Sequence, residues 1–279
     1  MTPLTLGSAS RNVPEDFPQL LELLGSRPQP AVVWYGSPGA QDSSEPERVE
    51  LSGRVLQNWA VKLIGLFREE LEEVFEGSAQ PVVLVDSAPH WKAAAVILAA
   101  GALGAEVVVR GTGPEGAGQE GTGQEDTGQE DTGQEAAGPA SLVVTHRPEA
   151  WQGSSALGEA ELAALSPGLL DESFEAATGR PLPAWVLDIS AEVRQQPDQL
   201  PAPLEPVGLP QSTGVGGQST GAGAQHSASG TLLVTGAEWS AGVVGGLISA
   251  WARSGTVVLF EGGPEDPGWE QMRRNEGLD

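Results

Sequence analysis

The sequence contains no cysteine. This absence excludes disulfides, thiolate metal sites and cysteine nucleophiles. Long apolar runs are also missing, because the longest, at 93–105, is shorter than the ~18 residues that indicate a membrane span. Residues 1–12 have no basic segment followed by an apolar one, so we expect no signal peptide. These absences together predict a cytoplasmic protein.

Positive charge is scarce as well. The chain has 14 Lys and Arg against 38 Asp and Glu, a formal net charge of -24. Such a charge repels nucleic-acid backbones and anionic lipid headgroups, so we expect neither nucleic acid nor membrane as a partner. The net charge does not exclude a protein partner. Lys92 is the last lysine, so the Gly/Ser/Thr-rich loops that follow it have no ammonium group to meet a phosphate.

What the chain does have is a series of short apolar runs rich in β-branched residues. They lie at 31–35, 81–86, 105–110, 141–145, 184–190, 231–235 and 256–260. Near-continuous apolar runs are typical of strands that are covered on both faces, as in a parallel sheet. Helical patterns lie at 16–25, after the N-cap candidate Ser52, at 89–103 and at 238–254.

Two strand–helix–strand units, at 81–110 and 231–260, have the length of a right-handed βαβ crossover. The sequence therefore predicts an α/β fold: a three-layer, mostly parallel, doubly wound sheet with helices on both faces, interrupted by disordered loops.

Two segments interrupt this pattern. Residues 118–137 repeat GQEGT, GQEDT, GQEDT and GQEAA, which bury too little apolar surface to offset the entropy of ordering, so we expect a solvated loop. Calcium binding is the alternative, but the repeats lack the ligand spacing of calcium loops. The second segment is Pro-rich and then Gly/Ser-rich, which is typical of a flexible linker. The predicted divisions are 1–110 (N-terminal βαβ part), 111–140 (acidic repeat loop), 141–194 (continued sheet), 195–230 (linker), 231–262 (last βαβ unit) and 263–279 (flexible tail).

Polar residues follow several predicted strands. In open α/β sheets ligands bind at the carboxyl ends of the strands, so these residues are the best candidates for a ligand site. They are Asp86, Ser87, His90, His146, Arg147, Asp188 and Ser190. The alternative is that they are turn residues whose side chains bond their own backbone. No histidine–carboxylate spacing indicates a metal.

The glycine loops at 214–217 and 221–223 are weak phosphate candidates. A phosphate cradle needs a strand–loop–helix corner, usually with a lysine, whereas 204–211 is broken by proline. The G-x-S-x-G match at 217–221 likewise lacks the flanking strand and helix of a nucleophile elbow.

The eight tryptophans against one tyrosine are unusual. Most fall on predicted helix faces or within predicted strands, where core packing explains them. Trp91 and Trp151 flank strand ends and are candidates to line an apolar pocket.

Residues 48–110 carry a family resemblance. A short strand at 49–51, Ser52 and an apolar helix are followed by a strand at 82–86, a polar turn, an Ala-rich helix and the exit GALGAEVVV at 101–109. This order resembles the N-terminal region of adenylate-forming enzymes (AMP-binding, acyl-CoA synthetase-like). More narrowly, it resembles a short actinobacterial family that keeps only this truncated region. The helix–Gly–strand unit at 247–259 is similar to a later unit of the same enzymes.

The departures from that family carry more weight. Adenylate-forming enzymes have a Ser/Thr/Gly-rich loop followed by Pro-Lys-Gly, whereas the nearest segment here, 212–223, has no lysine and no preceding strand. Their nucleotide-sensing aspartate, hinge and C-terminal domain with the catalytic lysine have no counterpart, so no catalytic residue carries over. We therefore predict a non-catalytic, degenerate relative that acts as a ligand-binding or interaction module and has no cofactor.

One alternative is the nucleotide- or acyl-binding half of an adenylate-forming activity that works with a separate partner, with ATP or AMP as its ligand. Another is an independent small α/β enzyme that uses Asp86, His146 and Asp188.

Overall fold

The computed structural model describes residues 13–36, 47–77, 80–110, 139–168, 171–210, 225–226, 230–236, 239 and 242–278. The acidic repeats and most of the Gly/Ser-rich segment lie outside these residues. The strands are β1 (Pro30–Tyr35), β2 (Arg48–Ser52), β3 (Val82–Asp86), β4 (Glu106–Arg110), β5 (Leu142–Thr145), β6 (Glu161–Ala164), β7 (Leu187–Asp188), β8 (Gln225–His226), β9 (Leu232–Thr235) and β10 (Val257–Phe260). The helices are α1 (Phe17–Gly25), α2 (Gly53–Glu70), α3 (Glu72–Glu76), α4 (Trp91–Ala102), α5 (Pro148–Trp151), α6 (Phe174–Thr178), α7 (Ile189–Glu192), α8 (Val243–Ala252) and α9 (Trp269–Glu276).

The strands form two sheets. One has the order β4-β3-β5-β6-β7 and is parallel throughout. The other has the order β2-β1-β10-β9-β8, with a parallel centre and antiparallel strands at both edges. Both predicted βαβ units are confirmed, as is the α/β class. We expected one sheet and find two, because an apolar run indicates burial on both faces of a strand but not which strand lies beside it.

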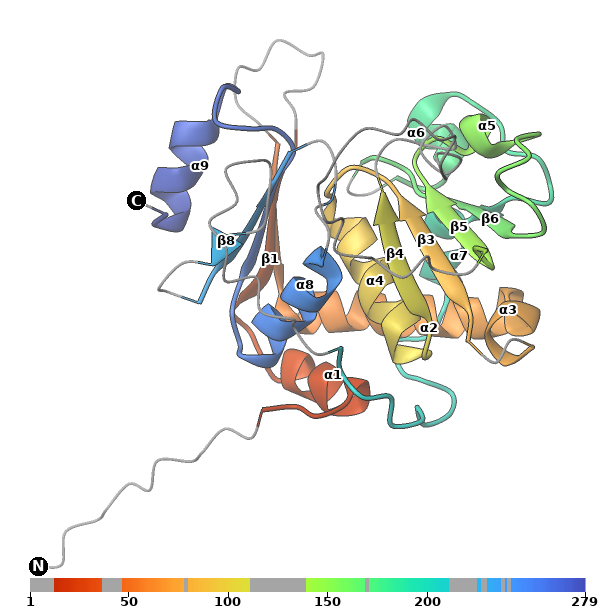
Figure 1. The fold of residues 1–279 in the computed structure, drawn as a ribbon, viewed down its shortest axis with the longest axis horizontal. Coiled ribbons are helices and arrows are strands. Elements are labelled where there is room, and N and C mark those ends of the chain that lie inside the picture. The colour runs from red at the N-terminus through yellow and green to blue at the C-terminus, as the bar shows by residue number, and fades with distance from the viewer. Residues whose placement is uncertain are drawn as a thin grey trace, which may run out of the picture.

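The two sheets share one layer of helices (Figure 1). Residues of α1, α2, α4 and α8 pack with strands of both sheets in a single apolar core. Every residue of α4 is buried, and its alanines allow this close packing. On its other face the β1-containing sheet is covered by α9, where Met272 packs on Val33 and Phe260. The β3-containing sheet is covered by α5 and α6, through Trp151 and Phe174. Each sheet therefore has helices on both faces, as predicted.

Capping residues explain where several helices begin. The Ser52 side chain accepts a hydrogen bond from the Val55 backbone N–H, which confirms its predicted role as the N-cap of α2. The helix predicted at 238–254 begins only at Val243, because Gly242 adopts a left-handed backbone with φ of 75°.

The strand predicted at 184–190 was wrong in extent. Only Leu187 and Asp188 pair with β6, and Trp185 is 52% exposed. The reason is local: the Asp188 carboxylate accepts hydrogen bonds from the Ser190 and Ala191 backbone N–H groups, and this cap starts α7 in place of further strand.

The chain after α7 lies against the shared helix layer. The Phe17 backbone N–H donates to the Val207 carbonyl at 3.0 Å, and the Lys62 ammonium donates to the Gln196 carbonyl at 2.5 Å. Residues 263–279, expected to be a flexible tail, contain α9, and the Tyr35 hydroxyl bonds Glu276 at 2.6 Å. Within the described residues, no helix has the length and apolarity needed to cross a bilayer.

Candidate functional site

A cavity of about 340 Å³ lies at the carboxyl ends of strands from both sheets; we call it the polar cavity. Its lining residues are Trp34, Glu47, Ala88, Pro89, His90, His146, Pro167, Gly168, Asp171, Ala177 and Glu261. Trp34 comes from β1 and Glu261 follows β10, whereas His90 and His146 follow β3 and β5. Ligands of open α/β folds bind at such strand ends. A cavity of similar volume elsewhere is lined mainly by apolar residues, which come from α1, α4, β4, α8 and the segment around Val207, and it has no comparable set of polar groups.

His90 is held in one tautomer. Its Nδ1 accepts a hydrogen bond from the Lys92 backbone N–H at 3.1 Å, so Nε2 carries the proton and donates to the Pro167 carbonyl at 3.1 Å. Burial lowers the pKa of His90 well below its usual value, and the nearby His146 and Lys92 lower it further. At neutral pH His90 is therefore an uncharged ring that supports one wall of the cavity.

His146 lies edge-on to His90, with ring centroids 5.1 Å apart. Burial lowers its pKa to about 4, with further lowering by the charges of Lys92 and Arg147. Among the described residues, its buried Nε2 has no hydrogen-bond partner. An uncharged imidazole at the cavity with an unsatisfied nitrogen is able to bond a ligand.

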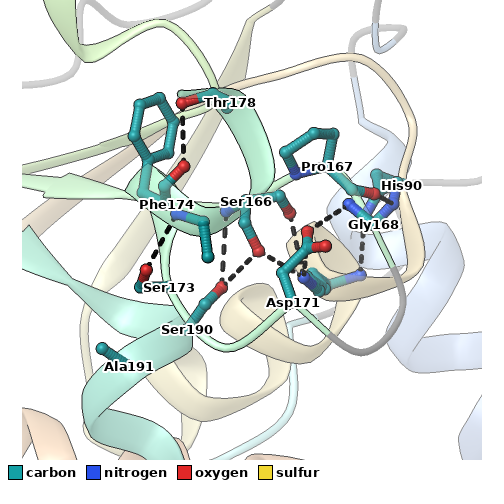
Figure 2. A network of polar contacts seen from close by, with 12 residues as sticks. His90, Ser166, Pro167, Gly168, Asp171, Ser173, Phe174, Thr178, Ser190 and Ala191 are labelled. Atoms are coloured by element: carbon teal, nitrogen blue, oxygen red, sulfur yellow. Dashed lines mark hydrogen bonds and ion pairs between the residues drawn. The ribbon is translucent and has the colours of Figure 1, made fainter. Parts of the chain in front are cut away.

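Lys92 is buried and belongs to a polar network, of which Figure 2 shows Ser166, Ser190 and Asp171. Its ammonium donates to the Ser166 carbonyl at 2.9 Å and to the Ser166 hydroxyl at 2.8 Å, and it lies 3.9 Å from the Asp171 carboxylate. The Ser166 hydroxyl is 2.6 Å from the Ser190 hydroxyl. Burial lowers the pKa of Lys92 to about 8. The network ties α4 to the chain after β6 and so positions Pro167 on the cavity wall.

Asp86 lies behind the cavity and does not line it. Its side chain is fully buried and accepts hydrogen bonds from the Trp151 indole N–H at 2.7 Å and the Thr145 hydroxyl at 3.2 Å. The Arg147 guanidinium is 3.6 Å from the same carboxylate. The Ser87 hydroxyl donates a hydrogen bond to the Ala88 carbonyl at 3.0 Å. These residues brace the loops that follow β3 and β5.

Asp188 and Ser190 also act as supports. Asp188 caps α7 and accepts a hydrogen bond from the Phe174 backbone N–H at 2.7 Å, while Ser190 belongs to the Lys92 network. Of the residues predicted from sequence, only His90 and His146 line the polar cavity. Ligand binding by any of them stays a prediction. Trp91 and Trp151, candidates for an apolar pocket, are fully buried and do not line the polar cavity.

Sequence reasoning missed the cavity residues Trp34, Asp171 and Glu261, and it missed the buried role of Lys92. Lys92 carried a signal, because it is the one charged residue in the otherwise apolar α4. Trp34, Asp171 and Glu261 carried no such signal, because only tertiary packing brings them near the histidines.

The charges that line the cavity are all negative. Carboxylates of Glu47, Asp171 and Glu261 face it, and neither Lys nor Arg is among its described lining residues. In that part of the chain, no group of His, Asp and Glu has the arrangement of a metal site. A polyphosphate placed here would meet carboxylates, and none of the described lining residues supplies a compensating cation.

The fold itself has counterparts among solved structures. No family model and no curated protein matches the sequence. A Brucella canis acyl-CoA synthetase superposes with a TM-score of 0.59 at 16% identity, over 94% of this chain and 46% of its own. The acetoacetyl-CoA synthetase of Streptomyces lividans gives 0.55 at 14% identity, over 94% and 41%. The anthranilate CoA ligase AuaEII gives 0.50 at 18% identity, over 90% and 45%.

The chain thus shares the fold of part of these acyl-CoA synthetases and of the CoA ligase, and it spans less than half of their length. The expected resemblance is confirmed as a likeness of fold.

Proposed function

We propose that the chain is a ligand-binding module that uses the acyl-CoA synthetase fold without performing adenylation. The observation that carries this proposal is the polar cavity at the strand ends of both sheets. It has the volume of a small-molecule site, an aromatic wall at Trp34 and an unsatisfied nitrogen on His146. The polar cavity is therefore the proposed ligand-binding site.

The electrostatics argue against adenylation. Forming an acyl adenylate places developing negative charge on phosphate oxygens, and enzymes meet that charge with preorganised cations and N–H donors. The cations nearest to the cavity are already engaged: Lys92 with Ser166, and Arg147 with Asp86. Releasing Lys92 would leave the buried Ser166 carbonyl without its donor, and releasing Arg147 would remove the cation beside the buried Asp86 carboxylate, at a cost of about 1–3 kcal/mol or more.

A thermal-shift screen of the full chain tests ligand binding. The screen holds Mg·ATP, AMP, acyl-CoAs, carboxylic acids, amines and neutral aromatics at millimolar concentration. A ligand that binds only the folded chain raises the melting temperature. We expect a shift from a non-nucleotide compound and none from Mg·ATP.

Two variants test whether the shift in melting temperature comes from binding in the polar cavity. The shift should disappear in Trp34→Leu and persist in Glu22→Gln, a control on the exposed face of α1. A screen in which no compound shifts the melting temperature, or in which Mg·ATP alone does, contradicts the proposal.

A second candidate is the nucleotide- or acyl-binding half of an activity shared with a separate partner. The observation that favours it is the β4 edge. Within the described residues β4 pairs only with β3, and its residues stay partly exposed on the open side. Cross-linking followed by size-exclusion chromatography should then capture a stoichiometric partner, and only the mixture should release pyrophosphate from ATP. If no partner is captured and the mixture releases no pyrophosphate, this candidate function is excluded.

A further inference from the structure

The two histidines of the polar cavity differ in the hydrogen bonds of their ring nitrogens. Both nitrogens of His90 are engaged, one by the Lys92 backbone N–H and the other by the Pro167 carbonyl. The His146 ring also lines the cavity, but its buried Nε2 has no hydrogen-bond partner among the described residues. Buried polar atoms in folded proteins nearly always have a partner, so this nitrogen indicates a place for a polar atom of a ligand.

The hydrogen-bonding needs of His146 narrow the choice of that polar atom. The two bonds of His90 fix its proton on Nε2. In the part of the chain that the structure describes, no residue bonds Nε2 of His146, so in the uncharged ring this nitrogen either donates or accepts. A hydroxyl group matches both cases, because it has one O–H donor and two acceptor lone pairs. A carboxylate matches only a donor, and an ammonium group matches only an acceptor.

The apolar residues of the lining suit an aromatic body. The Trp34 indole N–H is already engaged, because it donates to the Pro89 carbonyl at 3.1 Å. A ligand therefore meets only the apolar surface of the Trp34 ring, which lies edge-on to His90 with ring centroids 4.5 Å apart. Pro89, Pro167 and Ala177 add further apolar surface. A flat aromatic group packs well against such a ring.

The surroundings of His146 disfavour a charged ligand group. Burial is the main cause of the lowered pKa of His146, and the positive charge of Lys92 lowers it by more than the Asp86 carboxylate raises it. A ligand cation beside the ring would meet the same burial and the same positive charge. A ligand anion would lose its water without contacting a cation, because the described lining residues include neither Lys nor Arg. An uncharged polar group avoids both costs.

We propose that the ligand of the polar cavity is an uncharged aromatic compound that carries a hydroxyl group. The hydroxyl group bonds Nε2 of His146, and the aromatic body packs on Trp34 and Pro89. This inference rests on the proposed ligand-binding function and gives its ligand a chemical class. It assigns to His146 the recognition of the hydroxyl group.

Probes that share one aromatic body and differ in the polar group test this class. One series is 3-phenylpropanol, 3-phenylpropionate and 3-phenylpropylamine. The other is 2-naphthalenemethanol, 2-naphthoate and 2-naphthylmethylamine. Isothermal titration calorimetry on the full chain at pH 7 should show, in at least one series, the alcohol binding about tenfold or more tightly than both the acid and the amine.

A variant and a spectroscopic measurement locate the hydroxyl group at His146. His146→Phe keeps a flat ring and removes both nitrogens, so it should weaken binding of that alcohol about tenfold. Glu22→Gln, on the exposed face of α1, is the control and should bind the alcohol as the original chain does. In the original chain labelled with ¹⁵N-histidine, the alcohol should shift the Nε2 resonance of His146. The chain has three histidines, so few ring signals need assignment.

The outcomes separate this inference from the proposed function. If in both series the acid or the amine binds as tightly as the alcohol, or if neither alcohol binds, the hydroxyl inference is overturned, while another ligand of the polar cavity leaves the proposed function standing. An alcohol affinity that is unchanged in a normally folded His146→Phe variant overturns it too. If that variant does not fold, an Nε2 resonance that stays unshifted in the original chain saturated with the alcohol has the same consequence. If no compound of any kind binds in the thermal-shift screen, the proposed function itself fails.

Discussion

At the residue scale, the histidines were the predictable part of the site, because each follows a strand along the chain. Their uncharged state was not predictable, because it depends on burial and on Lys92, which approaches from α4. Similarly, the tryptophan pattern predicted core packing for Trp34, but only the arrangement of both sheets shows that its ring also forms a wall of the cavity.

The pKa of His146 predicts a dependence of stability on pH. Its folded-state pKa of about 4 lies below the ordinary histidine pKa of 6.5, so the unfolded chain takes up the proton first as the pH falls. The stability that His146 contributes is therefore complete above about pH 6.5 and is lost toward pH 4. A His146→Gln variant should lose less stability over this interval, by on the order of 3 kcal/mol at most.

Urea unfolding of both proteins at several pH values between 4 and 7 measures this difference. The carboxylates titrate in both proteins and largely cancel. If the free energies of unfolding of the two proteins change with pH in parallel, His146 is not held uncharged in the folded chain.

Lys92 makes a second prediction. Lys92→Met keeps the length of the side chain and removes the ammonium group, leaving the Ser166 carbonyl without its donor. We expect a loss of about 1–3 kcal/mol in the free energy of unfolding. Amide exchange should also accelerate at Gly168, whose N–H is held by Asp171. Unchanged exchange there would mean that Lys92 does not position the cavity wall.

At the element scale, the apolar helices and both βαβ units follow from patterns within a few residues. The elements that sequence reasoning missed, such as β6, α6 and α9, are short or polar and are defined by what they pack on. Met272 is the one fully buried residue of α9, and its partner Val33 lies far away in sequence. No local pattern reveals such a contact.

The close packing of α4 on α1 gives a test at this scale. A Cβ atom on Gly101 would lie 2.5 Å from the Phe17 ring, so Gly101→Ala forces one helix to shift. We expect a loss of about 1–3 kcal/mol in unfolding free energy, measured by urea denaturation. Gly263→Ala is the matched control, because nothing lies within 4 Å of its Cβ position. Equal stability of the two variants would contradict the described packing.

At the scale of the whole molecule, the composition predicts that the acidic repeats are dispensable. Residues 113–138 contain little apolar sequence and lie outside the described residues, so their stability effect is predicted from composition alone. A chain with these residues replaced by a short Gly/Ser linker should melt within a few degrees of the original and bind the same ligands. Loss of folding would show that the segment contributes to the core.

The overall likeness to acyl-CoA synthetases was predictable from the order of strands, turns and small residues at 48–110. The division into two sheets was not, because strand neighbours are chosen by tertiary packing. The negative cavity was not predictable either, since its carboxylates are more than two hundred residues apart at the extremes, Glu47 and Glu261.

The central claim is that this fold retains a ligand cavity but does not adenylate. The most direct test is a coupled assay of pyrophosphate release by the full chain with Mg·ATP and a broad mixture of carboxylic acids. We expect release at the rate of the buffer alone, with no change on adding the acids. Saturable release that requires both the protein and a carboxylate would contradict the account.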